Sequence, residues 1–398
     1  MEPLILTGCQ RGRGAFDEYW FHLPTIRQFA HQWPRLDFSD YPSATTPGYH
    51  VLLAAADRLV GDRPRTLKWI ASLFSIGLLS TLAAATARRA GFGPAVAVCL
   101  PVACSLYVVS SAAWLLPDNA GWWGVLGIML LALRGDVDGW TYFLGGLIFL
   151  AVVLVRQNHA WILAPLCAAV WMKPNDSRRR RDAGGPSRVA FLLLVCLPAM
   201  AALGWFIRLW HGMTPPSQRG YVGGFNPAAP VMALAVGGAI GVFFLPIIAS
   251  QLPARHAWRL AVPGAIVGLL IGIVPATSYS VADGRYSGIW NAVPHFPVVL
   301  GRSSLVVGLA ALGGVVMSLW LAILPSRRRW IWFSAAVAFG AAQAAGHNAF
   351  QRYDEPFILI AAALSLAPAA RHSPRWTWFG PLALSGILAA ITLLSLRL

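Results

Sequence analysis

Apolar runs long enough to cross a bilayer, which takes about 20 residues, recur along the chain. Charged residues make up only 12% of the 398 residues, against roughly 25% in a soluble domain. We therefore expect an all-α, polytopic transmembrane helical bundle of about twelve spans. The clearest runs lie at 67–87, 92–114, 189–209, 229–250, 260–276, 305–324 and 378–396, with shorter runs at 122–133, 142–155 and 160–171.

The net charge of +16 is spread unevenly, because basic residues concentrate in short segments between apolar runs. The positive-inside rule places these segments in the cytoplasm. The tract SRRRRD at 177–182 then acts as a topology anchor, and nucleic acid is not an expected partner. The basic segments lie at 88–89, 134, 173–188, 255–259, 327–329 and 371–375, which leaves 41–64, 118, 156–159, 211–227, 277–297 and 347–356 extracytoplasmic.

The chain is expected to divide at residue 65. Residues 1–65 form an N-terminal extracytoplasmic segment with interfacial amphipathic helices in 16–33 and 50–61, and 66–398 form the bundle. No cleavable signal peptide is expected, since the apolar stretch near the start is too short. No internal repeat is visible, which argues against a transporter built from duplicated halves.

The cysteines show no pattern typical of metal binding or redox chemistry. No CxxC or Cys/His metal spacing occurs, so we expect no metal and no cofactor. Small buried apolar side chains are the expected role of most of them. They are Cys9, Cys99, Cys104, Cys167 and Cys196.

Two adjacent carboxylates, Asp17 and Glu18, lie in the aromatic run FDEYWFH. They form either the solvated polar face of an interfacial helix or a general base that deprotonates a hydroxyl. Adjacent helical residues point about 100° apart, so only one can face a cavity well. We expect Asp17 to be the base and Glu18 to orient it or hold a neighbouring arginine. His22, one turn beyond Glu18, either contacts a phosphate or caps the pair.

Two arginines with few neighbouring cations lie on the predicted outer face. Arg156, at the end of an apolar run, either snorkels to the interface or clamps a phosphate in bidentate fashion. Arg352, together with His347, has the same two interpretations, and we expect it to be the primary phosphate ligand. Asp118, in LPDN, is either a helix N-cap or a ligand of sugar hydroxyls. Candidate aromatic stacking faces are Trp20, Tyr49, Trp122 and Trp290.

Four short motifs occur in an order that resembles one enzyme family, the dolichyl-phosphate-glucose α-1,2-glucosyltransferases. The resemblance implies a membrane glycosyltransferase of the GT-C type. It implies glucose transfer from a polyprenyl or dolichyl phosphate to a glycan or lipid-linked oligosaccharide, with inversion. Donor and acceptor contacts are then expected from Thr46, Tyr49, Asp118, Gln157, Asn158 and Tyr353. The motifs are Asp17-Glu18 with Phe21-His22, Thr45-Thr46-Pro47-Gly48-Tyr49, Arg156-Gln157-Asn158 with Trp161, and Arg352-Tyr353.

The chain also departs from that family's pattern. No transmembrane helix precedes the Asp-Glu motif, the threonine of the family's RQTN is absent, and Asp354-Glu355 follow the Arg-Tyr pair. The donor sugar and acceptor therefore stay open. A GT-C transferase of other specificity (mannosyl, arabinosyl or protein O-glycosyl) and a polytopic transporter or lipid flippase are the alternatives. In every case we expect a multi-pass protein of a bacterial inner membrane or its endoplasmic-reticulum equivalent, with membrane lipid as a partner and the active site extracytoplasmic.

Overall fold

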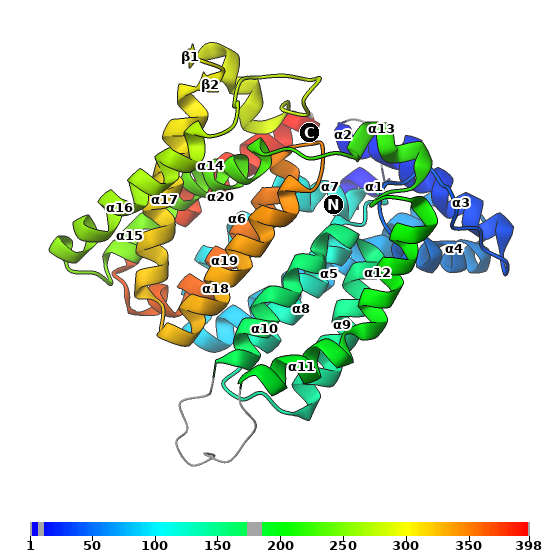
Figure 1. The fold of residues 1–398 in the computed structure, drawn as a ribbon, viewed down its shortest axis with the longest axis horizontal. Helices are drawn as coiled ribbons and strands as arrows, with labels where there is room; N and C mark the ends of the chain where they lie inside the picture. The colour runs from blue at the N-terminus through cyan, green and yellow to red at the C-terminus, as the bar shows by residue number, and fades with distance from the viewer. Residues whose placement is uncertain (1, 7–11, 173–184, 397–398) are drawn as a thin grey trace. The chain divides into compact units, whose positions relative to one another are not determined.

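The computed structural model describes residues 2–6, 12–172 and 185–396, and its regular structure is almost entirely helical (Figure 1). Cys9 and most of the basic segment 173–188, with the SRRRRD tract, lie outside the described residues. The chain forms two compact units, each assembled from three stretches. The first unit is Met1–Ser75, Ser111–Gly223 and Pro325–Ala342, and the second is Ile76–Ser110, Gly224–Leu324 and Gln343–Leu398.

The first unit contains the two helical segments expected near the N-terminus. The second of them begins at Gly48 after Pro47, as the sequence predicts. Its elements are α1 (Glu2–Leu6), α2 (Arg13–Asp17), the π-helical turn η1 (Glu18–His22), α3 (Leu23–Gln32), α4 (Gly48–Val60), α8 (Asp118–Ala132), α9 (Gly139–Val155), η2 (Gln157–Ile162), α10 (Leu163–Trp171), α11 (Gly185–Val195), α12 (Leu197–Trp210), η3 (Pro216–Gln218) and α13 (Arg219–Val222).

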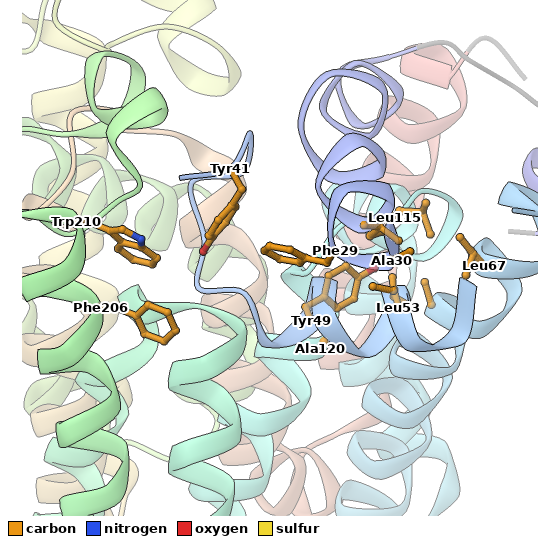
Figure 2. Packing of buried hydrophobic residues seen from close by; sticks show 13 residues of the cluster. Phe29, Ala30, Tyr41, Tyr49, Leu53, Leu67, Leu115, Ala120, Phe206 and Trp210 are labelled. Carbon is orange, nitrogen blue, oxygen red and sulfur yellow. The ribbon is translucent and has the colours of Figure 1, made fainter. Parts of the chain in front are cut away.

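A buried apolar cluster joins the N-terminal helices of the first unit to its other helices (Figure 2). Phe29 and Leu53 are fully buried where α3 packs on α4. Tyr41, from the link between these helices, stacks edge-on against Trp210 of α12 at 6.0 Å, and the Trp210 indole donates to the Phe38 carbonyl at 2.8 Å. The link is thus held by side-chain contacts in place of regular structure.

The second unit holds the only strands among the described residues, a two-stranded antiparallel hairpin. Its elements are α6 (Phe92–Cys104), α14 (Ala228–Gly241), η4 (Val242–Phe244), α15 (Leu245–Ala249), α16 (Ala254–Ile273), η5 (Gly288–His295), β1 (Val298–Val299), β2 (Arg302–Ser303), α17 (Ser304–Ile323), α19 (Gln351–His372), η6 (Arg375–Trp378) and α20 (Phe379–Leu396). The helices α5 (Pro64–Ala90), α7 (Leu106–Ala113) and α18 (Ser326–Ala344) each continue from one unit into the other.

Glycines allow α16 and α17 to pack with their backbones in contact. A Cβ on Gly264 would meet the carbonyl group of Gly314 at 2.5 Å. A Cβ on Gly268 would likewise meet the backbone of Ala310 and Ala311. Small residues four apart are typical of helix pairs in bilayers.

Within the described residues, six helices are long and apolar enough to cross a membrane, or up to eight if each of two bent pairs is one span. The apolar runs at 92–114 and 189–209 were expected as single spans, and each is broken. The first bends by 65° at Ser105 and the second by 55° at Cys196. The length and apolar composition of these helices are those of a membrane-embedded helical protein. The larger number of about twelve stays a prediction, since α8, α9 and α10 are short.

Candidate functional site

Of the two interpretations of the acidic pair near the N-terminus, a solvated polar face does not fit the structure. Asp17 and Glu18 are each only 8% exposed, whereas the aromatic rings beside them, Tyr19 and Trp20, are 62% and 57% exposed. A π-helical turn begins at Glu18, and such turns are frequent at functional sites. In this segment the acidic side chains face the protein and the aromatic side chains face outward. This is the reverse of an amphipathic helix whose outer face lies in water.

Glu18 is fixed by partners on both carboxylate oxygens. Nζ of Lys68, on the first turns of α5, lies 2.8 Å from one oxygen. The backbone N–H of Leu115 donates to the other at 3.0 Å. Glu18 thus holds a cation, but the cation is Lys68 and not the arginine expected from the sequence.

The Thr-Thr-Pro-Gly-Tyr motif fixes the start of α4. A Cβ on Gly48 would meet the Leu154 carbonyl oxygen at 2.7 Å, so only glycine allows α4 to approach α9 this closely. The next residue, Tyr49, is 1% exposed and its buried hydroxyl has no hydrogen-bond partner. Burial first, and then the negative charges of Glu18 and Asp118, raise the pKa of Tyr49 well above its usual value. The phenol therefore lies close to both carboxylates.

Thr46 and Gln157 have internal partners. The Thr46 hydroxyl donates to the Val153 carbonyl at 2.6 Å, and Gln157 Oε1 accepts the Thr46 backbone N–H at 2.9 Å. Gln157 Nε2 donates to the carbonyls of Ala44 and Met213 at 2.7 and 2.9 Å. These contacts give the two residues a positioning role, because their donors are occupied. Asn158 is exposed beside them.

His22 pairs with a histidine that sequence reasoning missed. His22 Nδ1 lies 2.9 Å from Nε2 of His50, the rings stack at 5.2 Å, and the Ser43 hydroxyl lies 3.5 Å from the same His22 nitrogen. Burial, and then His22, hold the pKa of His50 well below its usual value. The adjacency of His50 to the Thr-Thr-Pro-Gly-Tyr motif was the available signal.

Asp118 is not the N-cap that the sequence suggested. It is the first residue of α8, its carboxylate pairs with the Arg156 guanidinium, and both are buried. The Ser111 hydroxyl accepts the backbone N–H of Asn119 at 3.0 Å and so supplies the cap. Arg156 is only 8% exposed, which excludes a snorkelling side chain within this structure. Its charge is compensated by Asp118, and a phosphate would share the guanidinium with that carboxylate.

Next to this ion pair lies His159, whose Nε2 is buried and has no hydrogen-bond partner. Burial, and then Arg156, lower the pKa of His159 to about 3. A Cβ on Gly121 would meet its ring at 2.8 Å, so glycine leaves the space that the imidazole fills. Trp122 packs against the same ring with centroids 4.5 Å apart. Trp122 is a core side chain here and has no free stacking face.

The remaining predicted residues belong to the second unit. Arg352 and Tyr353 lie in the first turn of α19, which corrects the expectation of an outward loop at this position. Both are half-buried, as is His347, whose carbonyl accepts from the Asn226 side chain at 2.6 Å. Trp290 is fully buried and donates to a backbone carbonyl at 2.6 Å, so it too offers no stacking face.

The acidic pair that follows Arg352 is deeply buried within α19. Glu355 accepts from the Ser105 hydroxyl at 2.5 Å and from Gln351 at 2.8 Å. Ser105 is the residue at which α6 and α7 break. Asp354 is 2% exposed, and one of its carboxylate oxygens has no hydrogen-bond partner. In the sequence this pair is visible only as a departure from the family motif.

The first unit thus brings together most of the predicted residues, around the Glu18–Lys68 and Asp118–Arg156 ion pairs. Among the described residues, no group of three His, Cys, Asp or Glu side chains has the arrangement to hold a metal ion. No protein-family model, curated protein or solved structure matches this chain.

Proposed function

We propose that the protein is an inverting, membrane-embedded glycosyltransferase of the GT-C type. Its donor is a hexose, most simply glucose, on a polyprenyl or dolichyl phosphate, and its acceptor is a glycan or lipid-linked oligosaccharide. The observation that carries the proposal is the burial of Asp17 and Glu18 beside exposed aromatic rings. Because these carboxylates are buried, they do not serve to keep the segment in water. Buried carboxylates beside exposed aromatic rings, which suit contact with lipid, fit acid–base chemistry at a membrane face.

The division of labour follows from the partners of Glu18. Because both oxygens of Glu18 accept hydrogen bonds, Glu18 takes a positioning role. Asp17 keeps the role of base that is expected from the sequence. The acceptor hydroxyl attacks the anomeric carbon, its proton passes to Asp17, and the bond from that carbon to the phosphate oxygen breaks. The polyprenyl phosphate leaves with the bonding electrons. One carboxylate suffices for such a single displacement with inversion, whereas retention requires a second step.

Cations for the leaving phosphate are assigned to Arg352, with His347, and to Arg156. Guanidinium groups bind phosphate through two parallel hydrogen bonds. Arg352 is the primary ligand in this proposal, the role expected of it from the sequence. Tyr49 retains a buried hydroxyl without a partner beside Glu18 and Asp118, which suits a hydrogen bond to a sugar hydroxyl.

The membrane arrangement that accompanies this function has about twelve spans, including the short helices α8, α9 and α10. The active site then faces the extracytoplasmic side, with the N-terminal helices in the interface.

The test is sugar transfer by the purified protein in liposomes. Polyprenyl-phosphate glucose, mannose and arabinose, each radiolabelled, are supplied with a membrane extract as the acceptor source. Transfer of one labelled sugar that is lost in Asp17→Asn and kept in Asp37→Asn would support the proposal, since Asp37 is exposed. A folded protein that transfers none of the three sugars would reject it.

A polytopic transporter is the second candidate, and one observation favours it. Ionisable side chains at a broken helix are typical of ion-coupled transporters, and Glu355 bonds Ser105 at such a break. In this case Glu355→Gln would abolish solute uptake that depends on a proton or sodium gradient. Asp17→Asn would leave that uptake unchanged.

A further inference from the structure

The tip of a small hairpin carries some of the most exposed large apolar side chains of the second unit. Strands β1 and β2 pair antiparallel, with Val299 opposite Arg302. The turn between them, Leu300-Gly301, is apolar. Val299 is 66% exposed and Leu300 is 85% exposed. The preceding Phe296 is 44% exposed, and the sequence PHFPVVLG at 294–301 carries no Asp, Glu, Lys or Arg.

The backbone conformation of the turn is unfavourable for leucine. Leu300 has φ 50° and Gly301 has φ 76°, the pattern of a type I′ hairpin turn. Asn-Gly or Gly-Gly is favoured there because the first residue must adopt a left-handed conformation. A branched apolar residue in that conformation is uncommon. Strain retained at an exposed tip suggests that the side chain has a role.

The hairpin is anchored rigidly beside the end of α16. The Gly301 carbonyl accepts the backbone N–H groups of Thr277 and Ser278 at 2.9 and 3.1 Å. The Arg302 guanidinium donates to the carbonyls of Ile273 and Val274 at 3.0 and 3.3 Å. These bonds occupy the final carbonyls of α16 and fix the tip near its last turn.

The exposed apolar surface of α16 ends at the same place. Only 11% of the 18-residue apolar stretch of α16 is buried inside the protein. One stripe, at four-residue spacing, comprises Val262, Ile266, Leu270 and Val274, which are 52%, 52%, 54% and 73% exposed. A helix of this length spans about 30 Å, the hydrocarbon thickness of a bilayer. The last turn and the adjoining hairpin therefore lie at interfacial depth if α16 spans.

We infer that residues 296–300 form a lipid-inserted wedge, with Leu300 seated at the boundary between headgroups and acyl chains. The occupant of this surface is bilayer lipid, because the tip adjoins the lipid-facing stripe of α16 and carries no charge. Arg302 donates hydrogen bonds to the carbonyls at the end of α16, while the apolar tip enters the membrane. The wedge would hold the 277–303 segment against the bilayer surface, whichever reaction the protein performs.

The experiment uses a diazirine-bearing leucine analogue placed singly in the full chain, in nanodiscs of phosphatidylethanolamine and phosphatidylglycerol. Irradiation releases nitrogen and leaves a carbene, which inserts into a lipid C–H bond or a water O–H bond. Mass spectrometry then compares the two adducts. The analogue at Leu300 and at Val299 should give lipid adducts at a yield comparable with Leu270 on α16. The analogue at the exposed Ala282 in the same unit should give mainly water adducts.

Two outcomes would overturn the wedge. Mainly water adducts at both Leu300 and Val299 would show that the tip lies in solvent. Covalent dimers of the chain in place of lipid adducts would show that a second copy covers the tip. Using two positions guards against a variant that misfolds, and thermal unfolding of each labelled protein identifies such a variant.

Discussion

Nζ of Lys68 lies 2.8 Å from Oε1 of Glu18, and each of these side chains is only 10% exposed. The pair ties the start of α5 to the π-helical turn that contains the candidate base. A second ion pair, between Arg27 and Asp62, has the same length but is 43% and 65% exposed. The two pairs therefore have the same shortest distance and differ in burial, and the difference in burial decides what each contributes.

Removing the lysine of the buried pair should strongly destabilise the protein. Lys68→Met leaves a buried carboxylate without its cation, and the free energy of unfolding should fall by about 3–5 kcal/mol. Arg27→Met, in the exposed pair, should cost less than about 1 kcal/mol. Denaturant unfolding of both variants in one detergent makes the comparison. Equal losses would mean that Lys68 and Glu18 are solvated and uncoupled.

Stability should fall in mild acid because two histidines are held neutral. The pKa of His50 lies well below its ordinary 6.5, and that of His159 is lowered to about 3. Below pH 6.5 the unfolded chain binds protons that the folded chain does not, so the free energy of unfolding decreases as the pH falls. Each histidine should contribute about 1.4 kcal/mol of loss between pH 7.5 and 5.5.

Unfolding at both pH values checks this expectation in His50→Asn and His159→Asn. Each substitution removes a titrating group and should flatten the pH dependence. His31→Asn, at an exposed position of α3, serves as the control and should keep the wild-type slope. A slope unchanged in all three variants would mean that other groups cause the acid sensitivity.

Sequence pattern predicted the helical class and the N-terminal helices, since hydropathy and turn residues act over short distances. It did not predict the breaks at Ser105 and Cys196, because apolar composition continues through both and only tertiary contacts distinguish them. The same limit applies to Asp118. Its position at a helix start is typical of a cap. The ion pair is seen only in the structure, because Arg156 comes from a distant segment of the chain.

The site was predictable where its residues share a motif and was missed where they come from elsewhere. Asp17, Glu18 and His22 were identified from a short acidic and aromatic run. Their partners Lys68 and His50 lie 50 and 28 residues beyond Glu18 and His22 in sequence, with no local spacing to indicate contact. Pairing between such positions depends on how helices pack, and a single sequence holds no direct signal for it.

Phosphate recognition by Arg352 predicts an effect on donor use alone. Arg352→Ala should weaken donor binding by about 1.5–3 kcal/mol, the contribution of a hydrogen bond to a charged group, and raise the donor KM by about 10- to 100-fold. Arg371→Ala, at the exposed far end of the same helix, should leave KM unchanged. Transfer kinetics at varied donor concentration measure both. Similar KM values for the two variants would remove Arg352 from the donor site.

The last prediction separates the roles of the adjacent carboxylates by using stability and turnover together. Asp17→Asn keeps the shape and polarity of the side chain but cannot accept the acceptor proton. In the folded variant kcat should fall about 10²–10⁴-fold, the usual contribution of general-base catalysis. Glu18→Gln should mainly lose stability, because the amide no longer compensates the charge of Lys68.

Glu18→Gln should therefore unfold more easily, yet retain a larger share of turnover at a temperature where it is folded. The double variant with Lys68→Met should recover part of the lost stability, since it removes both buried charges. If Glu18→Gln is fully stable and inactive while Asp17→Asn is active, the base is Glu18 and its contact with Lys68 belongs to catalysis. If both folded variants turn over normally, the buried pair supports the fold alone, and the proposed base mechanism is wrong.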